Sequence, residues 1–142
     1  MYITLDEKSS KKEMKTLNLY ITKTLHVNKD TKIQTYNYHP KTKKELKEII
    51  EKLIKERGNN ADLNDIDVSA ITDMTGVFYN SVFNGDISEW DVSKVTNMTY
   101  MFGYSQFNGD ISEWDVSNVE NMDDIFHRSL LEKNPPKWYK KQ

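Results

Sequence analysis

The sequence of 142 residues contains no cysteine, which excludes disulfides, thiolate metal sites and thiol nucleophiles. Apolar residues are few: they make up 37% of the chain, and the mean hydropathy is −0.78. No stretch approaches the roughly 18 consecutive apolar residues of a membrane-spanning helix. The first residues, MYITLDEKSSKKEM, do not have the pattern of a signal peptide. We therefore expect a cytoplasmic protein of one domain, with a narrow core and no contact with a membrane.

Basic residues are nearly missing from one half of the chain. Residues 59–130 contain two Lys/Arg against thirteen Asp/Glu, a net charge of −11, whereas residues 1–58 carry +6 and residues 131–142 carry +3. The net charge of the whole chain, −2, hides this segregation. An acidic region can steer a basic partner toward itself. It repels phosphates, so we expect no direct binding of nucleic acid there.

The most informative feature of the sequence is a repeat. The string FNGDISEWDVS occurs at residues 83–93 and again at 107–117, 24 positions later. A degenerate copy precedes these two, and Trp138 follows Trp114 by another 24 residues, in a partial fourth copy. A period of 20 to 29 residues is typical of leucine-rich repeats, whose units stack on one another. Equivalent residues are therefore expected to lie one above the next, including Trp90, Trp114 and Trp138.

Each copy is predicted to contain two short elements. DISEW, at residues 86–90 and 110–114, follows an Asn-Gly turn signal and favours a strand. NMTYMFGYS, at residues 97–105, favours a short helix, since Met98, Met101 and Phe102 would share one face.

A longer helix is predicted immediately before the repeats. Thr42 and Glu45 form a capping box, and Gly58 is placed to end the helix. One apolar stripe runs along it and would cover the first repeat; it consists of Leu46, Ile49, Ile50, Leu53 and Ile54. Further upstream, residues 17–27 and 32–38 favour strands, which predicts a β-hairpin.

The strings WDVSKVTNM and WDVSNVENM, with Met101-Phe102 after the first, resemble the BspA-like leucine-rich-repeat family, in particular its short bacterial or phage-type members. The similarity covers about residues 60–130. It implies a right-handed β/α solenoid that serves in surface attachment or protein binding, with no cofactor and no catalytic residue to carry over.

Together these features predict an α/β repeat fold: a short right-handed β/α solenoid, similar to leucine-rich repeats, with an N-terminal capping helix and a preceding β-hairpin. The expected organisation is an N-terminal β-leaning extension (1–38), the capping helix (39–58), three 24-residue repeats with a partial C-terminal repeat (59–138), and a tail (139–142).

Residue types that carry chemistry are present but not grouped in a recognisable way. His26, His39 and His127 lie far apart in the sequence, so no histidine metal site is predicted. No G-x-S-x-G or Gly-rich phosphate loop occurs. NGDISEWD has the oxygen donors of a calcium loop but no Glu at the twelfth position. We therefore expect a protein that is not an enzyme and needs no metal or cofactor.

Acidic residues recur at equivalent positions and are the candidate partner-binding site. The carboxylates would stand in columns on adjacent copies, and the aspartates could also cap turns through backbone N–H groups. This pattern predicts a non-enzymatic module that binds another protein through its repeat face; homodimerisation is also possible. The alternative is an acidic inhibitor that imitates nucleic acid and blocks a nucleic-acid-handling enzyme, for example an anti-defence protein. The candidate residues are Asp86, Asp110, Glu89, Glu113, Asp91 and Asp115.

Overall fold

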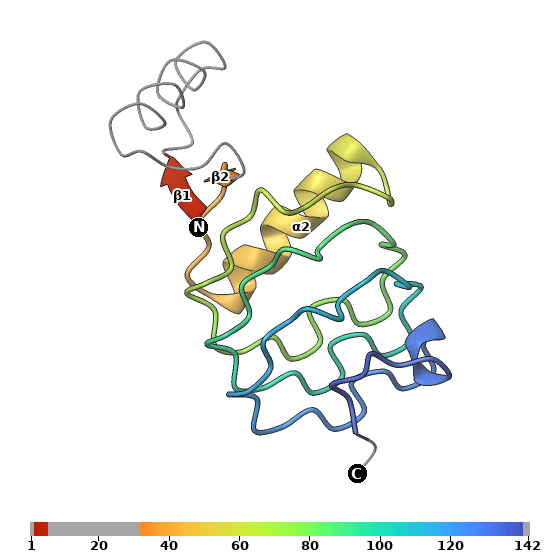
Figure 1. The fold of residues 1–142 in the computed structure, drawn as a ribbon. Helices are drawn as coiled ribbons and strands as arrows, with labels where there is room; N and C mark the ends of the chain where they lie inside the picture. Colours follow the sequence, from red (N-terminus) through yellow and green to blue (C-terminus); the bar gives the residue numbers. More distant parts are fainter. Residues whose placement is uncertain (1, 6–31, 141–142) are drawn as a thin grey trace.

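The computed structural model describes residues 2–5 and 32–140. Its regular elements are strands β1 (Tyr2–Leu5) and β2 (Lys32–Thr35), helix α2 (Lys43–Arg57) and the short 3-10 helix η1 (Leu130–Glu132). The rest of the described chain runs in turns and irregular segments that are stacked coil upon coil (Figure 1). Helix α2 covers one end of this stack, and the C-terminal segment lies at the other end. No helix among the described residues is both long and apolar enough to cross a membrane.

The predicted fold class, a β/α solenoid with a preceding β-hairpin, is wrong. Within the described repeats no strand forms: neighbouring coils share only single parallel bridges, such as those between Asp73 and Asn97 and between Asn97 and Asn121. The predicted strands at 86–90 and 110–114 and the predicted helix at 97–105 are turns.

Short polar side chains explain why DISEW does not extend into a strand. Asp86 accepts hydrogen bonds from the backbone N–H and the hydroxyl of Ser88, at 2.9 and 2.7 Å. The backbone N–H of Trp90 then donates to the carbonyl of Ile87. Asp and Asn that bond the backbone two residues further on favour turns over sheet pairing. The repeated Asp-x-Ser pattern was therefore a turn signal within the predicted strands.

Two residues with a left-handed backbone explain why 97–105 is not a helix. Tyr100 and Tyr104 have φ values of 54° and 53°, whereas an α-helix needs φ near −60°. In place of helical bonds, alternate N–H groups donate to the next coil: Met98 to Asn121, Tyr100 to Asp123, Phe102 to Ile125 and Tyr104 to His127, at 2.8–3.1 Å.

The β-hairpin is also corrected. Strand β2 overlaps the predicted segment 32–38, but it pairs with β1, in parallel, from Tyr2 with Lys32 to Leu5 with Thr35. Two parallel strands require a crossover and cannot be a hairpin. The other predicted strand, residues 17–27, lies outside the described residues.

Helix α2 forms where the sequence placed it. The Thr42 hydroxyl accepts the N–H of Glu45, and Gly58, with φ of 92°, ends the helix by donating to Ile54. The predicted apolar stripe faces the repeats, with Leu46, Ile50 and Leu53 buried in the common core. At its last residue, Arg57 donates two hydrogen bonds of 2.8 Å to the carboxylate of Asp65. The helix is thus fixed by both apolar and ionic contacts to the first coil. With the period of 24, the first, second and third coils are residues 59–82, 83–106 and 107–130.

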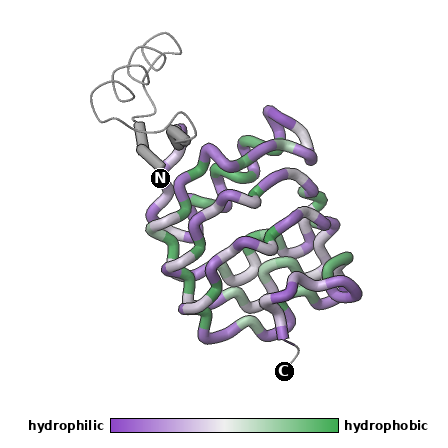
Figure 2. The backbone as a smooth tube through the Cα atoms, in the orientation of Figure 1, coloured by the Kyte–Doolittle hydropathy of each residue, from purple (hydrophilic) through white to green (hydrophobic). Residues whose placement is uncertain are grey.

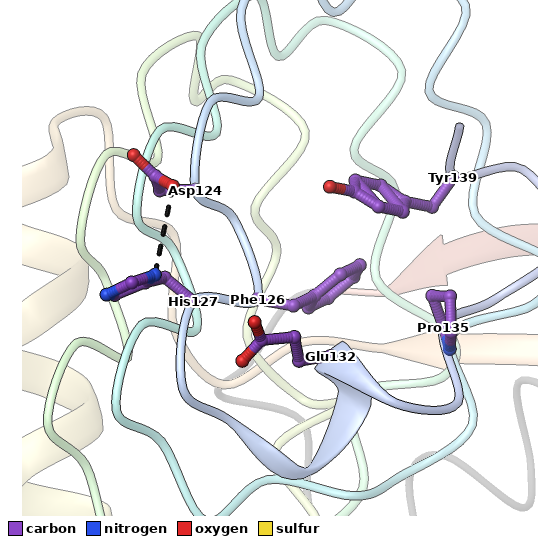
Figure 3. Close-up of a pocket in the computed structure, with 6 residues that line it drawn as sticks. All are labelled: Asp124, Phe126, His127, Glu132, Pro135 and Tyr139. Atoms are coloured by element: carbon purple, nitrogen blue, oxygen red, sulfur yellow. Dashed lines mark ion pairs between the residues drawn. The ribbon is translucent and has the colours of Figure 1, made fainter. Parts of the chain in front are cut away.

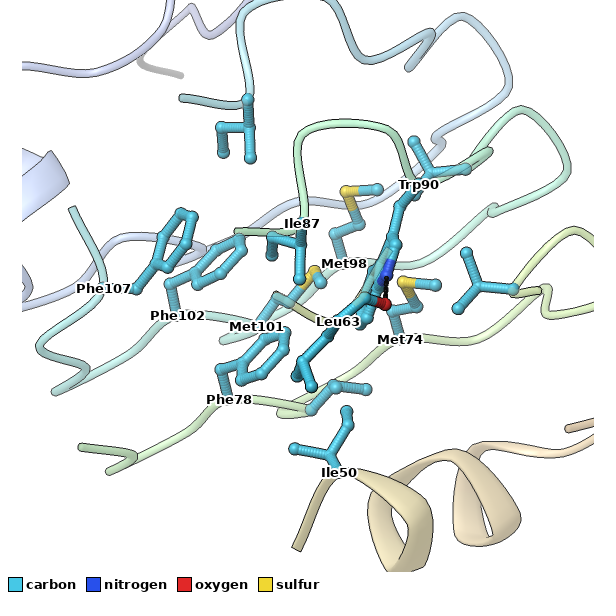
Figure 4. Packing of buried hydrophobic residues seen from close by; sticks show 14 of the residues in the cluster. Ile50, Leu63, Met74, Phe78, Ile87, Trp90, Met98, Met101, Phe102 and Phe107 are labelled. Atoms are coloured by element: carbon cyan, nitrogen blue, oxygen red, sulfur yellow. Dashed lines mark hydrogen bonds between the residues drawn. The ribbon is translucent and has the colours of Figure 1, made fainter. Parts of the chain in front are cut away.

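The core confirms that residues 24 apart lie on one another. Phe78 stacks on Phe102 with ring centroids 5.5 Å apart, and Trp90 stacks on Trp114 at 6.4 Å. Figure 4 shows Phe78, Phe102 and Trp90 packed together between coils. The three tryptophans make the same hydrogen bond in successive coils, from indole N–H to the carbonyls of Leu63, Ile87 and Ile111. Along each coil, short apolar and polar stretches alternate (Figure 2), which leaves a narrow core.

Candidate functional site

The four candidate aspartates hold the turns of their own coils. Asp86, Asp91, Asp110 and Asp115 each accept a hydrogen bond from the backbone N–H of the serine two residues later. Bonds from the hydroxyl and N–H of Ser88 lower the pKa of Asp86, and equivalent bonds from Ser112 lower the pKa of Asp110. The negative charge of Asp86 raises the pKa of Asp110 and so opposes this lowering. The two carboxylates are therefore near enough to interact, as the predicted column requires. All four carboxylates are therefore engaged in turns within the protein.

Glu89 and Glu113 are exposed, as expected. The backbone N–H of Glu89 donates to the side-chain oxygen of Asn64, a buried residue of the previous coil. The acidic columns therefore remain a candidate surface, in which the four aspartates cap turns and Glu89 and Glu113 are exposed.

A second surface, which the sequence did not reveal, is aromatic. Tyr79, Tyr100 and Tyr104 are 51%, 37% and 42% exposed. Tyr79 makes edge-to-face contacts with Tyr100 and Tyr104, with ring centroids 6.0 and 5.7 Å apart. His127 makes the same kind of contact with both, at 6.1 and 5.4 Å. We call these four residues the aromatic face.

The backbone beneath the aromatic face requires left-handed residues. In the described ranges, five residues other than glycine have positive φ. Together with Gly76 they recur every 24 residues: Gly76, Tyr100 and Asp124 in one series, and Asn80, Tyr104 and Arg128 in the other. Glycine and asparagine adopt this conformation readily, but a large aromatic residue is strained in it. The first coil therefore has the residues best suited to the backbone, while the second has two exposed tyrosines.

Gly103 allows the rings to pack closely. A Cβ atom at this buried position would lie 3.0 Å from the Tyr100 ring and 3.1 Å from the Tyr79 ring. Tyr79 stands in the first coil where Gly103 stands in the second and His127 in the third. The three coils thus contribute different residues to one continuous surface.

Asp124 joins the aromatic face to a cleft of about 240 Å³. Its carboxylate lies close to the hydroxyl of Tyr100 and raises the pKa of that hydroxyl, and it lies 3.9 Å from Nδ1 of His127. Figure 3 shows Asp124 and His127 at one end of the cleft, Tyr139 and Pro135 at the other, and Phe126 and Glu132 between them. The cleft has aromatic walls and two carboxylates.

A shallow groove also borders Tyr104. Asparagine, serine, glutamine and arginine make up most of its lining, and the exposed apolar residues Val82 and Leu130 lie among them. In the described part of the chain, no three His, Asp or Glu side chains lie together as a metal-binding group.

Fold and site together define a stacked-repeat protein with an exposed aromatic face. A family model described as "Mycoplasma protein of unknown function, DUF285" matches residues 44–142. The match covers more than half of the chain, so the protein belongs to the DUF285 family. No curated protein and no solved structure matches the chain. The resemblance to BspA-like proteins therefore stays a prediction.

Sequence reasoning missed the aromatic face because it looked for what the copies share. The residues that build this face are those in which the copies differ, with Gly76 and Asn80 replaced by Tyr100 and Tyr104. This difference between copies was the signal in the sequence. A tyrosine at a position where another copy has glycine or asparagine indicates a side chain that points away from the core, as both tyrosines do.

Proposed function

We propose that this protein is a non-enzymatic module that binds another protein through its repeat region. The exposed aromatic face is the observation that carries the proposal. Contiguous exposed apolar side chains mark interaction sites on soluble proteins, and tyrosine is enriched at the centre of protein interfaces. A cytoplasmic location remains part of this prediction.

The strain at Tyr100 and Tyr104 supports this proposal. An unfavourable backbone conformation at a bulky residue costs about 1–3 kcal/mol, and the first coil shows that glycine and asparagine fit the same backbone. Because both tyrosines are exposed, packing of the core does not require them. Binding is a role that would balance the cost of these two residues.

Rigidity of the scaffold supports it further. Beneath the face, Phe102 is fully buried and stacks on Phe78 and Phe126, and the backbone is bonded to the coils on both sides. A surface that is formed before its partner arrives loses little conformational entropy on binding.

Nucleic-acid mimicry is the second candidate. The net charge of −11 across residues 59–130 favours it, because a dense array of carboxylates resembles a phosphate backbone to a basic enzyme surface. In that case Glu89 and Glu113 would make the contacts, and binding would depend strongly on salt.

One capture experiment separates the two candidates. Three tagged proteins are used to recover partners from a lysate of the cells that produce the protein: the wild type, Tyr79→Ser/Tyr104→Asn, and Glu89→Lys/Glu113→Lys. We expect a specific partner of the wild type to be lost with the tyrosine variant and retained with the glutamate variant. Loss only with the glutamate variant, in a salt-sensitive manner, would favour mimicry. A partner retained by both variants would refute the aromatic face as the binding surface.

A further inference from the structure

Acidic groups accompany the aromatic face where it borders the cleft. Asp124 contacts Tyr100 and His127 on the face, and its side chain is 51% exposed. Glu132, also exposed, lies across the cleft and accepts a hydrogen bond of 2.6 Å from the backbone N–H of Arg128. The residues that line this cleft include two carboxylates and no lysine or arginine. The two carboxylates are therefore the acidic groups of its lining, and Arg128 and Lys133 follow lining residues in the sequence.

The cleft walls are flat and apolar. Phe126 is buried at its floor and makes an edge-to-face contact with Tyr139, with ring centroids 5.1 Å apart. Pro135 and His127 complete the walls (Figure 3). A volume of about 240 Å³ suits one long side chain and not a whole peptide or a large cofactor.

Aromatic rings beside carboxylates are the chemistry that recognises an organic cation. A guanidinium or ammonium group is attracted to a ring face, and it also pairs with a carboxylate. Residues 59–130, which include Asp124 and the aromatic face, have a net charge of −11, and residues 131–142, which supply Glu132 and Tyr139, carry +3. The larger acidic part attracts a basic segment from a distance and repels an acidic one.

We propose that the aromatic face and the adjoining cleft form a docking site for an arginine- or lysine-bearing segment of a partner protein. One cationic side chain enters the cleft between Asp124 and Glu132, and its neighbours lie over Tyr100 and Tyr104. This inference rests on the proposed function, whose partner it defines by chemistry.

A defined peptide tests the site. Hexa-arginine is titrated into the full chain by calorimetry at low salt, with hexa-citrulline as the neutral control of nearly the same shape. We expect binding of hexa-arginine and no detectable binding of hexa-citrulline. The double variant Tyr100→Gly/Tyr104→Asn, which copies Gly76 and Asn80 of the first coil, should weaken binding at least about fivefold. Its Tm should not fall, because both replacements suit the left-handed backbone.

A matched pair of variants distinguishes the site from general attraction to an acidic protein. Asp124→Asn and Glu113→Gln each remove one negative charge, and asparagine tolerates the φ of 55° at position 124. Asp124→Asn should weaken binding of hexa-arginine at least about fivefold, and Glu113→Gln should change it by less than about twofold.

The remaining outcomes overturn the proposal. Equal weakening by both charge variants would show non-specific attraction, and no binding at about 1 mM peptide would exclude a cationic segment. Sedimentation could also show a dimer of the wild type that Tyr100→Gly converts to monomer. In that case a second copy of the chain, and not a basic partner, occupies the site. If the peptide fails but Tyr79→Ser/Tyr104→Asn still loses a cellular partner, the chemistry proposed for that partner is wrong and the binding function stands.

Discussion

Individual aspartates decide the course of the backbone in this protein. Each Asp-x-Ser unit ties a carboxylate to the serine that follows, as in Asp67 with Ser69 and Asp91 with Ser93. Asn97 does the same for Thr99 with its side-chain oxygen. A neutral amide oxygen can therefore replace the carboxylate in the turn, although it cannot be titrated.

We expect stability to decline in acid as Asp86 and Asp115 are protonated. Hydrogen bonds from Ser88 lower the pKa of Asp86, and those from Ser117 lower the pKa of Asp115. Because the pKa is lower in the folded chain, the stabilisation is complete above the ordinary aspartate value of about 3.9 and is lost as the pH falls through the folded value. The Tm, followed by circular dichroism between about pH 7 and pH 2, should fall below about pH 4.

The control for this prediction is Asp86→Asn/Asp115→Asn, which keeps the turns but cannot titrate. It should show a weaker fall of Tm in acid than the wild type. An unchanged pH profile would mean that other groups govern the acid transition.

Gly85 is needed for a close approach between coils. A Cβ atom here would lie 1.9 Å from the carbonyl oxygen of Ala61, which accepts the N–H of Asp86 at 2.9 Å. Gly85→Ala should therefore lower the free energy of unfolding by about 2–3 kcal/mol in a denaturant titration. Gly109→Ala is the comparison. Its added Cβ would lie 2.6 Å from the Phe107 ring, much as that of Gly85 would lie 2.5 Å from the Phe83 ring, but its nearest backbone oxygen is 3.2 Å away. Its cost should therefore be smaller. Equal costs would contradict this account.

At the scale of elements, α2 is the one long helix among the described residues, and its position was predictable. Its caps and apolar stripe are local signals that the structure confirms. Its attachment to the first coil was not predictable, because the guanidinium of Arg57 meets Asp65 only after the chain has turned back on itself. Burial alone would raise the pKa of Asp65, but bonds from Arg57 and Asn37 outweigh it and lower the pKa.

Replacing Arg57 by lysine should loosen this attachment. Lysine keeps the charge but cannot form the two parallel bonds to Asp65 or reach the carbonyl of Asp62 at the same time. We expect Arg57→Lys to lower the free energy of unfolding by about 1 kcal/mol. The reverse exchange Lys55→Arg, on the exposed side of the same turn, should have no effect. If the two variants changed the free energy of unfolding equally, the paired hydrogen bonds of Arg57 would not be the cause.

The whole molecule is a stack in which successive coils make equivalent backbone bonds. Met74 donates to Asn97 in the next coil, and Met98 donates to Asn121 in the one after. Removing one full period would therefore present each coil with a neighbour that has equivalent core positions at the same heights.

Deleting residues 83–106 should give a chain that still folds, with a lower Tm than the wild type and a single unfolding transition. The deletion joins Val82 to Phe107, which restores the local sequence found at Val82-Phe83. Deleting only residues 83–102 removes less of the chain but shifts the register by four, so the cooperative transition should be lost. Thermal unfolding of the two proteins checks this, and similar stability of both would refute in-register stacking as the main source of order.

The sequence alone determined the period, the identity of stacked residues and the capping helix, because each depends on residue types at fixed spacing. Trp90, Trp114 and Trp138 could be matched by counting, and they make equivalent bonds. The shape of each coil was decided by tertiary structure. Alternate N–H groups bond to the next coil, and this pattern forces Tyr100 and Tyr104 into a left-handed conformation that local propensity disfavours. The aromatic face arises for the same reason: Tyr79, Tyr100, Tyr104 and His127 come from three coils, and only stacking brings their rings together.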